Sequence, residues 1–170
     1  QVERMRQIIG YQLERAASSP HMTLAAPVSV LKVVQRLSNT LQKVYADKKV
    51  NSSFSIASQV VFIGDEGDLL EMLGNLMENA YKWSENRVYI SARNIDNDVD
   101  SKLEVTIEDD GPGVPEDKLE HVLKRGYRAD ETVSGQGIGL AVVKEIIHAY
   151  SGQLAVERSN LGGAKFIIHF

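Results

Sequence analysis

Three groups of residues combine side-chain types and spacings that could do chemistry. In the first, Asn75, Asn79 and Lys82 follow one another at steps of four and three, so a helix would place them along one stripe. Asn is a poor helix former, so two on one helical face need a reason. Either both are satisfied surface amides, or their oxygens face a hard cation such as Mg²⁺, which takes few protein ligands when phosphate oxygens supply the rest. Trp83 follows Lys82 directly.

The second group is the run from Glu108 to Pro115, which comes directly after an alternating apolar segment that ends at Ile107. An Asp at the end of a strand can accept a hydrogen bond from an exocyclic amino group, which would be the role of Asp109. Glycines let the backbone approach a flat ring closely, and this run contains two. An ordinary Asp-Gly and Pro-Gly turn would have the same composition. The residues of this group that could bind a ligand are Asp109, Gly111, Gly113 and Val114.

The third group opens the last helical pattern of the chain and reads G-x-G-x-G. Free amides in the first turn and the helix dipole favour an anion there, so phosphate is a natural occupant, although the glycines could also form a hinge. The chain has no G-x-x-x-x-G-K-[ST] motif, which excludes a P-loop enzyme. Lys82 and Arg128 are basic residues that could reach a polyphosphate. The group consists of Gly135, Gln136, Gly137, Ile138, Gly139 and Leu140.

Composition limits the classes of protein to consider. The chain has 170 residues, of which 43% are hydrophobic, with a net charge of -4 and no cysteine. These proportions are typical of a globular domain and exclude a disulfide scaffold. The mild acidity argues against a nucleic-acid partner, and no apolar run approaches the roughly 20 residues that span a bilayer, so we expect no membrane contact by this chain. The chain begins with Gln1, and we therefore expect it to be a piece of a longer protein.

The hydrophobic periodicity predicts the elements that must position these groups. Residues 1–17 have a helical pattern and residues 20–26 read as a connector. Pro27 would be the first residue of a second helix that stops near Asp47, and Asp65 would cap a third. We expect strands at 54–56, 60–63, 88–92, 103–107, 154–157 and 165–170, a last helix over 138–150, and a long loop between 110 and 136. Consecutive strand pairs predict an α/β (α+β) two-layer sandwich, with a mixed, mostly antiparallel sheet and helices on one face.

Taken in this order, the segments Asn75–Trp83, Asp109–Pro115, Gly135–Leu140 and Gly162–Ala164 resemble the four sequence boxes of the GHKL ATP-binding superfamily. The resemblance covers about residues 27–170 and implies the Bergerat fold, with a long ATP lid. It implies that Asn79 binds Mg²⁺ and that Asp109 binds the adenine amino group. It also implies that Trp83 lies beside the adenine. Phosphate-facing roles would fall to Asn75, Lys82, Arg128 and Gln136, and the glycines at 111, 113, 135, 137 and 139 would shape the lid and the phosphate site.

One position separates the reaction classes within this superfamily. The members that hydrolyse ATP typically carry an acidic residue four positions before the Mg²⁺ ligand, where this chain has Asn75, which cannot act as a general base. The chain is therefore similar to the catalytic domain of sensor histidine kinases, which pass the γ-phosphoryl group of ATP to a His. An ATP-hydrolysing enzyme and a nucleotide-binding interaction module are the alternatives.

The same resemblance implies the partners and the domain organisation. Residues 1–19 would be the end of a dimerisation-hairpin helix, 20–26 a connector and 27–170 the ATP-binding domain. None of the histidines lies in an H-[ED]-x-x-[TN]-P motif, so the phosphoacceptor would lie on a dimerisation domain outside this chain. The parent would be a homodimeric inner-membrane sensor with this domain in the cytoplasm, and it would pass phosphate to a response regulator. The histidines are His21, His121, His148 and His169.

Overall fold

A computed structural model describes residues 26–95, 102–115 and 139–170 of the chain. The expected helix over 1–17, most of the connector, and the loop from 116 onward lie outside these described residues. None of the helices in the described part of the chain is long and apolar enough to span a bilayer. The elements are β1 (Pro27–Ser29), α2 (Val30–Val44), the short 3₁₀ helix η1 (Ala46–Lys48), β2 (Asn51–Ile56), β3 (Val61–Ile63), α3 (Glu66–Trp83), β4 (Arg87–Ile95), β5 (Lys102–Asp109), α5 (Gly139–Ala149), β6 (Gln153–Arg158) and β7 (Ala164–His169).

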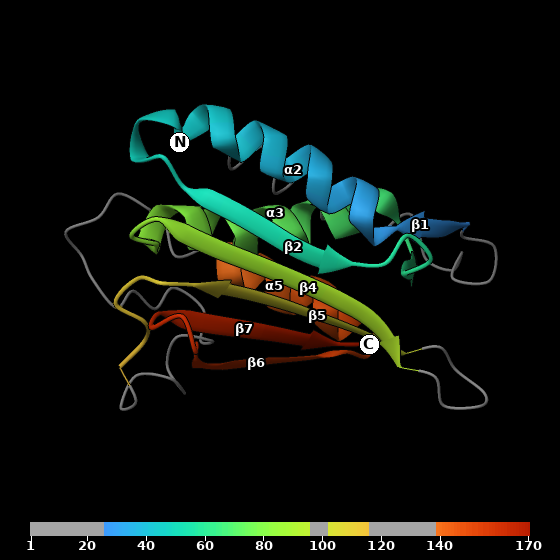
Figure 1. Cartoon of the computed structure of the whole chain (residues 1–170). Coiled ribbons are helices and arrows are strands. Elements are labelled where there is room, and N and C mark those ends of the chain that lie inside the picture. Colours follow the sequence, from blue (N-terminus) through green and yellow to red (C-terminus); the bar gives the residue numbers. More distant parts are fainter. Residues whose placement is uncertain (1–25, 96–101, 116–138) are drawn as a thin grey trace, which may run out of the picture.

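Five strands form the main sheet in the order β2-β4-β5-β7-β6. β2 pairs with β4 in parallel, and every other neighbouring pair is antiparallel. Helices α3 and α5 lie against one face of this sheet, and α2 packs alongside α3 near the β2 edge (Figure 1). The prediction of a two-layer sandwich with a mixed, mostly antiparallel sheet is therefore confirmed.

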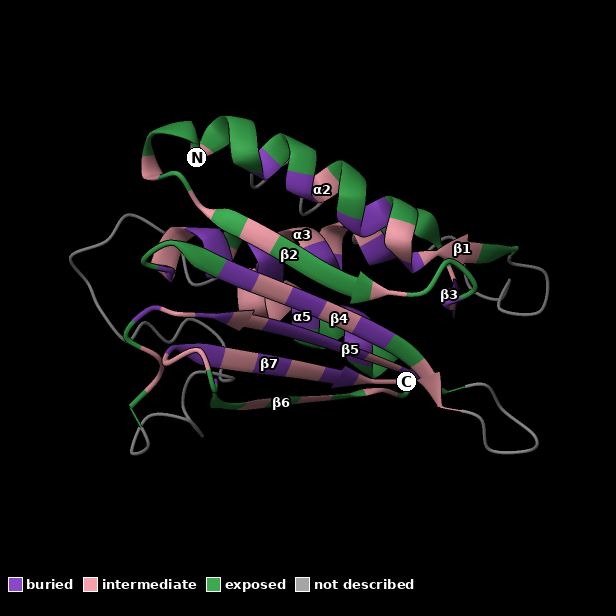
Figure 2. Cartoon of the chain, in the orientation of Figure 1, coloured by how far each residue is buried: buried purple, intermediate pink, exposed green. Residues whose placement is uncertain are grey.

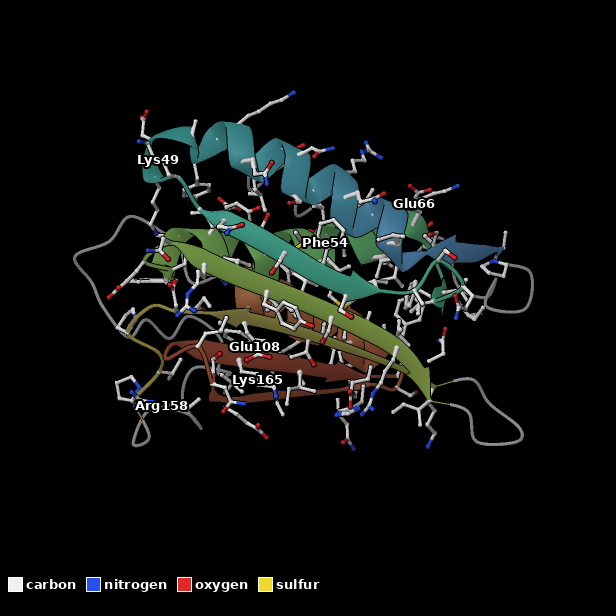
Figure 3. The ribbon with its side chains drawn as sticks, in the orientation of Figure 1. Lys49, Phe54, Glu66, Glu108, Arg158 and Lys165 are labelled. Atoms are coloured by element: carbon white, nitrogen blue, oxygen red, sulfur yellow. The ribbon has the colours of Figure 1, made fainter. Side chains whose placement is uncertain are left out.

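The core lies between the sheet and the helices. Along β4, and along β5 except at the buried Thr106, buried residues alternate with more exposed ones, so one face of each strand is turned to the helices (Figure 2). The other face carries polar side chains such as Glu108 and Lys165, which are register partners on β5 and β7 and are labelled in Figure 3. Helix α3 supplies the largest share of the core, with Leu69, Met72, Leu73, Leu76, Met77 and Tyr81 all fully buried.

The entry into α2 differs from the sequence prediction. Pro27 is not the first residue of the helix. It begins β1, which pairs antiparallel with β3 in a separate two-stranded sheet. The reason is the cap: Ser29 has an extended backbone, and its hydroxyl accepts from Lys32 N, at 3.4 Å. Ala26, which would have to cap a helix that begins at Pro27, has no such acceptor, and a Pro is tolerated at the first position of a strand.

One side chain of the main sheet makes hydrogen bonds to the backbone of the two-stranded sheet. The Asn94 amide, near the end of β4, accepts from Val61 N at 3.1 Å and donates to Val61 O at 3.2 Å. It thereby completes the backbone hydrogen bonding of β3 from outside the two-stranded sheet. The strands predicted at 54–56 and 60–63 both exist, but they belong to different sheets because β3 pairs with β1 while β2 pairs with β4.

Helix α3 begins at a tight polar network. As predicted, Asp65 caps the helix, with its carboxylate accepting from Asp68 N at 3.0 Å. The Tyr150 hydroxyl, just after α5, donates to Asp68 Oδ2 at 2.6 Å and accepts from Asp65 N at 3.1 Å. Its ring packs against Phe62 and Phe170. Tyr150 therefore ties the end of α5 to the start of α3.

The variant Tyr150→Phe should lose about 1–3 kcal/mol of unfolding free energy, because buried Asp68 loses its hydroxyl partner. Burial, followed by the hydrogen bond to Asp68, raises the pKa of Tyr150 to about 12, above the ordinary value of 10.0. The folded state thus holds this proton more tightly, so stability falls as the pH rises from 10 through 12. Urea unfolding across this range should show that the unfolding free energy falls more steeply with pH in the wild type than in the Phe variant. An equal slope in both would contradict the assignment.

Candidate nucleotide-binding site

Asp109 is the buried acid at the centre of the candidate site. It is the last residue of β5, and only 3% of it is exposed. Its Oδ1 accepts from Gly111 N at 2.9 Å and from Ala164 N at 3.2 Å. Burial raises the pKa of Asp109, and these two backbone hydrogen bonds oppose that rise. Among the described residues none donates to Oδ2, which leaves one carboxylate oxygen able to accept from a ligand.

The glycines around Asp109 are required by backbone crowding. A Cβ on Gly163 would overlap Asp109 Oδ1 and would lie 2.5 Å from Gly111 N. A Cβ on Gly111 would overlap the carbonyl oxygen of Trp83, the last residue of α3. Gly113 has φ +74, a left-handed conformation that favours glycine. The sequence analysis assigned Gly111 and Gly113 to close approach of a flat ring, which stays a prediction; within the protein, the groups that lie against these two glycines are the end of α3 and the turn before β7.

The predicted polar stripe lies on α3. Asn75 is half-buried, and its amide nitrogen donates to Glu71 O at 2.8 Å, within the same helix. Its Oδ1 lies so close to Gly139 that a Cβ there would be 2.6 Å away. Asn75 therefore touches Gly139, the first residue of α5. Of the group predicted to bind phosphate, the structure describes Gly139 and Leu140. Asn79 is one helical turn further along and is also half-buried.

The end of the stripe brings a cation to an aromatic ring. Lys82 Nζ lies 5.6 Å from the centre of the Trp83 ring, within the range of a cation–π contact. Both residues are partly exposed. Val114 and Leu140 pack against the core from either side of the undescribed segment. The predicted site residues Arg128, Gly135, Gln136, Gly137 and Ile138 lie outside the described residues, and their roles stay predictions.

Two further residues hold this region, and the sequence did not single them out. Asp110 Oδ1 accepts from the backbone N–H groups of Glu85, Asn86 and Arg87, at 2.9, 3.1 and 2.9 Å. Burial would raise the pKa of Asp110, but these hydrogen bonds and the Arg87 side chain outweigh it and hold the pKa below its usual value. Lys48 Nζ donates to Tyr81 O at 2.8 Å and to Lys82 O. Both contacts join residues more than 20 positions apart, so no local pattern signals them.

The donor set fits a nucleotide with a magnesium ion better than a protein-only metal site. No cluster of three or more His, Cys, Asp or Glu that could hold a metal occurs among the described residues. A single amide oxygen, as Asn79 offers, suits a cation whose other ligands are phosphate and water. The crowded glycines and the half-satisfied Asp109 fit an adenine. The structure also places His148 exposed on α5, and His169 on β7 at 3.5 Å from Glu104.

Comparison with known proteins places this geometry in a family. Residues 64–170 match the family model described as "Histidine kinase-, DNA gyrase B-, and HSP90-like ATPase". The whole chain aligns at 42% identity with the two-component sensor PhoQ of Pseudomonas aeruginosa and at 39% with the sensor protein PhoQ of Escherichia coli K12. It spans 37% and 34% of those proteins, about a third of their length.

Solved structures give the same fold. The mycobacterial sensor histidine kinase MprB superposes with a TM-score of 0.74 at 27% identity, covering 86% of this chain and 97% of that one. The catalytic domain of the histidine kinase ThkA superposes with a TM-score of 0.73 at 19% identity, covering 87% of this chain and 95% of that one. The likeness to ThkA concerns the fold alone.

Proposed function

The chain belongs to the histidine kinase-, DNA gyrase B- and HSP90-like ATPase family, and from this premise we propose that it is the catalytic ATP-binding domain of a PhoQ-type sensor histidine kinase. It binds ATP with Mg²⁺ and donates the γ-phosphoryl group to a His on a separate dimerisation domain. The observation that carries the proposal is Asp109, a buried carboxylate at a strand end with one oxygen fixed by backbone N–H groups and the other accepting from no residue in the described ranges.

The candidate site residues have different parts in holding the nucleotide. Asp109 Oδ2 accepts from the exocyclic amino group of adenine, and the Trp83 ring lies beside the base. Asn79 holds Mg²⁺, and Lys82 faces the phosphates together with Arg128, Gln136 and the glycines that precede α5. With Asn79 as its ligand from this chain, Mg²⁺ would supply neutralisation of the charge that develops on the phosphoryl group during transfer. Because phosphoryl transfer depends on positioning and charge neutralisation, the domain needs no nucleophile of its own.

Asn75 supports transfer to a protein over hydrolysis. An amide cannot remove a proton from water, and the Asn75 nitrogen already donates to Glu71 O. The acceptor is a His of the parent homodimer, and the phosphoryl group then passes to an Asp of a response regulator similar to PhoP. Because the relatives named PhoQ are sensor proteins, we also propose that the domain lies on the cytoplasmic side of an inner-membrane sensor.

The test supplies this chain with [γ-³²P]ATP, Mg²⁺ and a separately produced dimerisation domain that carries the phosphoacceptor His. We expect label on that domain, and none when its His is replaced by Ala. Tight ATP binding without transfer to the added domain would exclude the kinase proposal. Steady ATP turnover by this chain alone would favour an ATPase, and failure to bind nucleotide while binding a regulator would favour an interaction module.

The variant Asn79→Ala should distinguish the contribution of Mg²⁺ to the affinity from the contribution of the adenine base. Calorimetric titration of a non-hydrolysable ATP analogue should show affinity that depends on Mg²⁺ in the wild type and loses that dependence in the variant. We expect at least a roughly tenfold loss with Mg²⁺, because one ligand of a hard cation is removed, and an unchanged affinity for adenosine. The exposed Asn51→Ala is the matched control. Full Mg²⁺ dependence in the Asn79 variant would refute this ligand assignment.

A further inference from the structure

Lys48 contacts the end of the helix that carries the candidate site, and the proposed function gives it no role. It is the last residue of η1, and its ammonium donates to Tyr81 O and to Lys82 O. The final carbonyls of a helix have no partners within the helix and carry partial negative charge. A cation there both satisfies these carbonyls and offsets their charge. The two residues that follow these carbonyl groups in the helix are Lys82 and Trp83, which face the proposed nucleotide.

The segment that follows α3 in the chain is also fixed, by Asp110. Asp110 accepts from the N–H groups of Glu85, Asn86 and Arg87, directly after the helix. The Trp83 carbonyl lies against Gly111, where no side chain could fit. Trp83 therefore lies between two fixed segments, with Lys48 on the carbonyl groups that precede it and Asp110 on the N–H groups that follow it.

Lys48 also acts electrostatically on the acids of the site. Its own pKa is lowered by burial, while the charges of Asp109 and Asp110 raise it. In return, Lys48 is among the influences that lower the pKa of Asp109, against the larger effect of burial. The ammonium therefore favours the ionised form of the carboxylate that is to accept from the base.

We propose that Lys48 is a positioning residue for the adenine side of the nucleotide site: it fixes the last turn of α3, with Lys82 and Trp83, against the segment Asp109–Gly111. This inference rests on the proposed function. It predicts that Lys48 sets affinity for the base itself, although Lys48 contacts only the backbone carbonyls at the end of the helix, those of Tyr81 and Lys82.

The experiment titrates adenosine and, separately, a non-hydrolysable ATP analogue with Mg²⁺ into the wild type, Lys48→Met, Lys48→Gln and Lys48→Arg. Lys49→Met is the matched control, since Lys49 is exposed at the same corner of the molecule (Figure 3). We expect Lys48→Met to weaken both ligands by the same factor, about tenfold. Arg has donors for both carbonyls and a charge, so Lys48→Arg should restore affinity to within about twofold.

Trp83 is the only tryptophan of the chain, so its fluorescence reports on this turn directly. Acrylamide quenching of the ligand-free protein should increase in Lys48→Met and not in Lys49→Met. Each titration is made at a temperature where thermal melting shows the variant to be folded. If Lys48→Met does not fold, Lys48→Gln decides, because its amide still donates to a carbonyl but carries no charge.

Wild-type affinity for adenosine in a folded Lys48→Met or Lys48→Gln would overturn the inference, whatever the change in melting temperature. Weaker binding of the ATP analogue with unchanged binding of adenosine would also overturn it, since Lys48 would then act on the phosphate side. In both cases the proposed function stands, because the wild type binds. Absence of binding of either ligand by the folded wild type would instead overturn the proposed function, and this inference with it.

Discussion

Replacing Asp109 with Asn should lower the affinity for ATP and for adenosine by about 100-fold, which corresponds to about 2.7 kcal/mol. A hydrogen bond to a charged acceptor contributes about 1.5–3 kcal/mol. The Asn oxygen can still take the place of Oδ1 and accept from Gly111 N and Ala164 N. The Asn nitrogen then faces the ligand in place of Oδ2, so that two donors oppose each other.

The same substitution should leave the ligand-free domain at least as stable at pH 7 as the wild type. Burial raises the pKa of Asp109 above its ordinary value of 3.8, which means that the folded state binds this proton more tightly than the unfolded state. Stability from this group is therefore greatest at low pH and falls as the pH rises through the folded pKa. An Asn never ionises, so the variant avoids this loss.

Calorimetric titration checks the expected loss of affinity, and urea unfolding at several pH values checks the expected stability of the ligand-free domain. The difference in unfolding free energy between Asp109→Asn and the wild type should shrink as the pH falls from 7 toward about 4, and should not change further at lower pH, where the carboxyl is protonated in both states. Asp47→Asn, at an exposed position, is the control and should change neither property. Retained adenosine affinity in the Asp109 variant would remove the observation on which the proposed function rests.

Two glycine substitutions should change the free energy of unfolding in opposite directions. In Gly163→Ala the new Cβ would overlap Asp109 Oδ1 and would lie 2.6 Å from Asp109 O, in a region of buried backbone that cannot move aside easily. We expect a loss of about 3 kcal/mol of unfolding free energy, at the upper end of overpacking costs, together with weakened nucleotide binding. In Gly74→Ala, inside α3, the new Cβ would meet Leu37 at 3.6 Å, an ordinary contact.

Gly74→Ala should therefore stabilise the domain by about 0.5–1 kcal/mol, because Ala has the higher helix propensity. Urea unfolding of both variants, with nucleotide titration, measures the comparison. Gly163→Ala with wild-type stability would show that the turn before β7 is free to shift away from Asp109, and that Asp109 is held less firmly than its contacts indicate.

Local signals explain how much could be predicted from the sequence. The cap at Asp65, the periodicity of α3 and the alternation of β4 and β5 are local, and each element formed where its pattern indicated. The contact between Gly111 N and Asp109 is local too, because the two residues are neighbours in the chain, whereas the role of Asp109 toward adenine stays a prediction. Pairing partners are a non-local property: nothing near β3 shows that it pairs with β1, and Pro27 alone favoured a helix start over a strand. The contacts of Lys48 span 33 and 34 positions, which the sequence pattern does not record.

The short sheet of β1 and β3 also determines how force would enter the domain. Any tension applied through the chain before Pro27 loads a ladder of only three residue pairs. From β3 the load passes through the Asn94 amide to the end of β4, and β4 runs along nine residues to Arg87, beside Asp110. Figure 1 shows β1 at the opposite end of the sheet from the β5 terminus that carries Asp109. One route for a pull at the entry of the domain thus runs through the Asn94 amide and along β4 to the far corner, in parallel with the ring of Phe62 in β3, which packs on Tyr150 and Phe170.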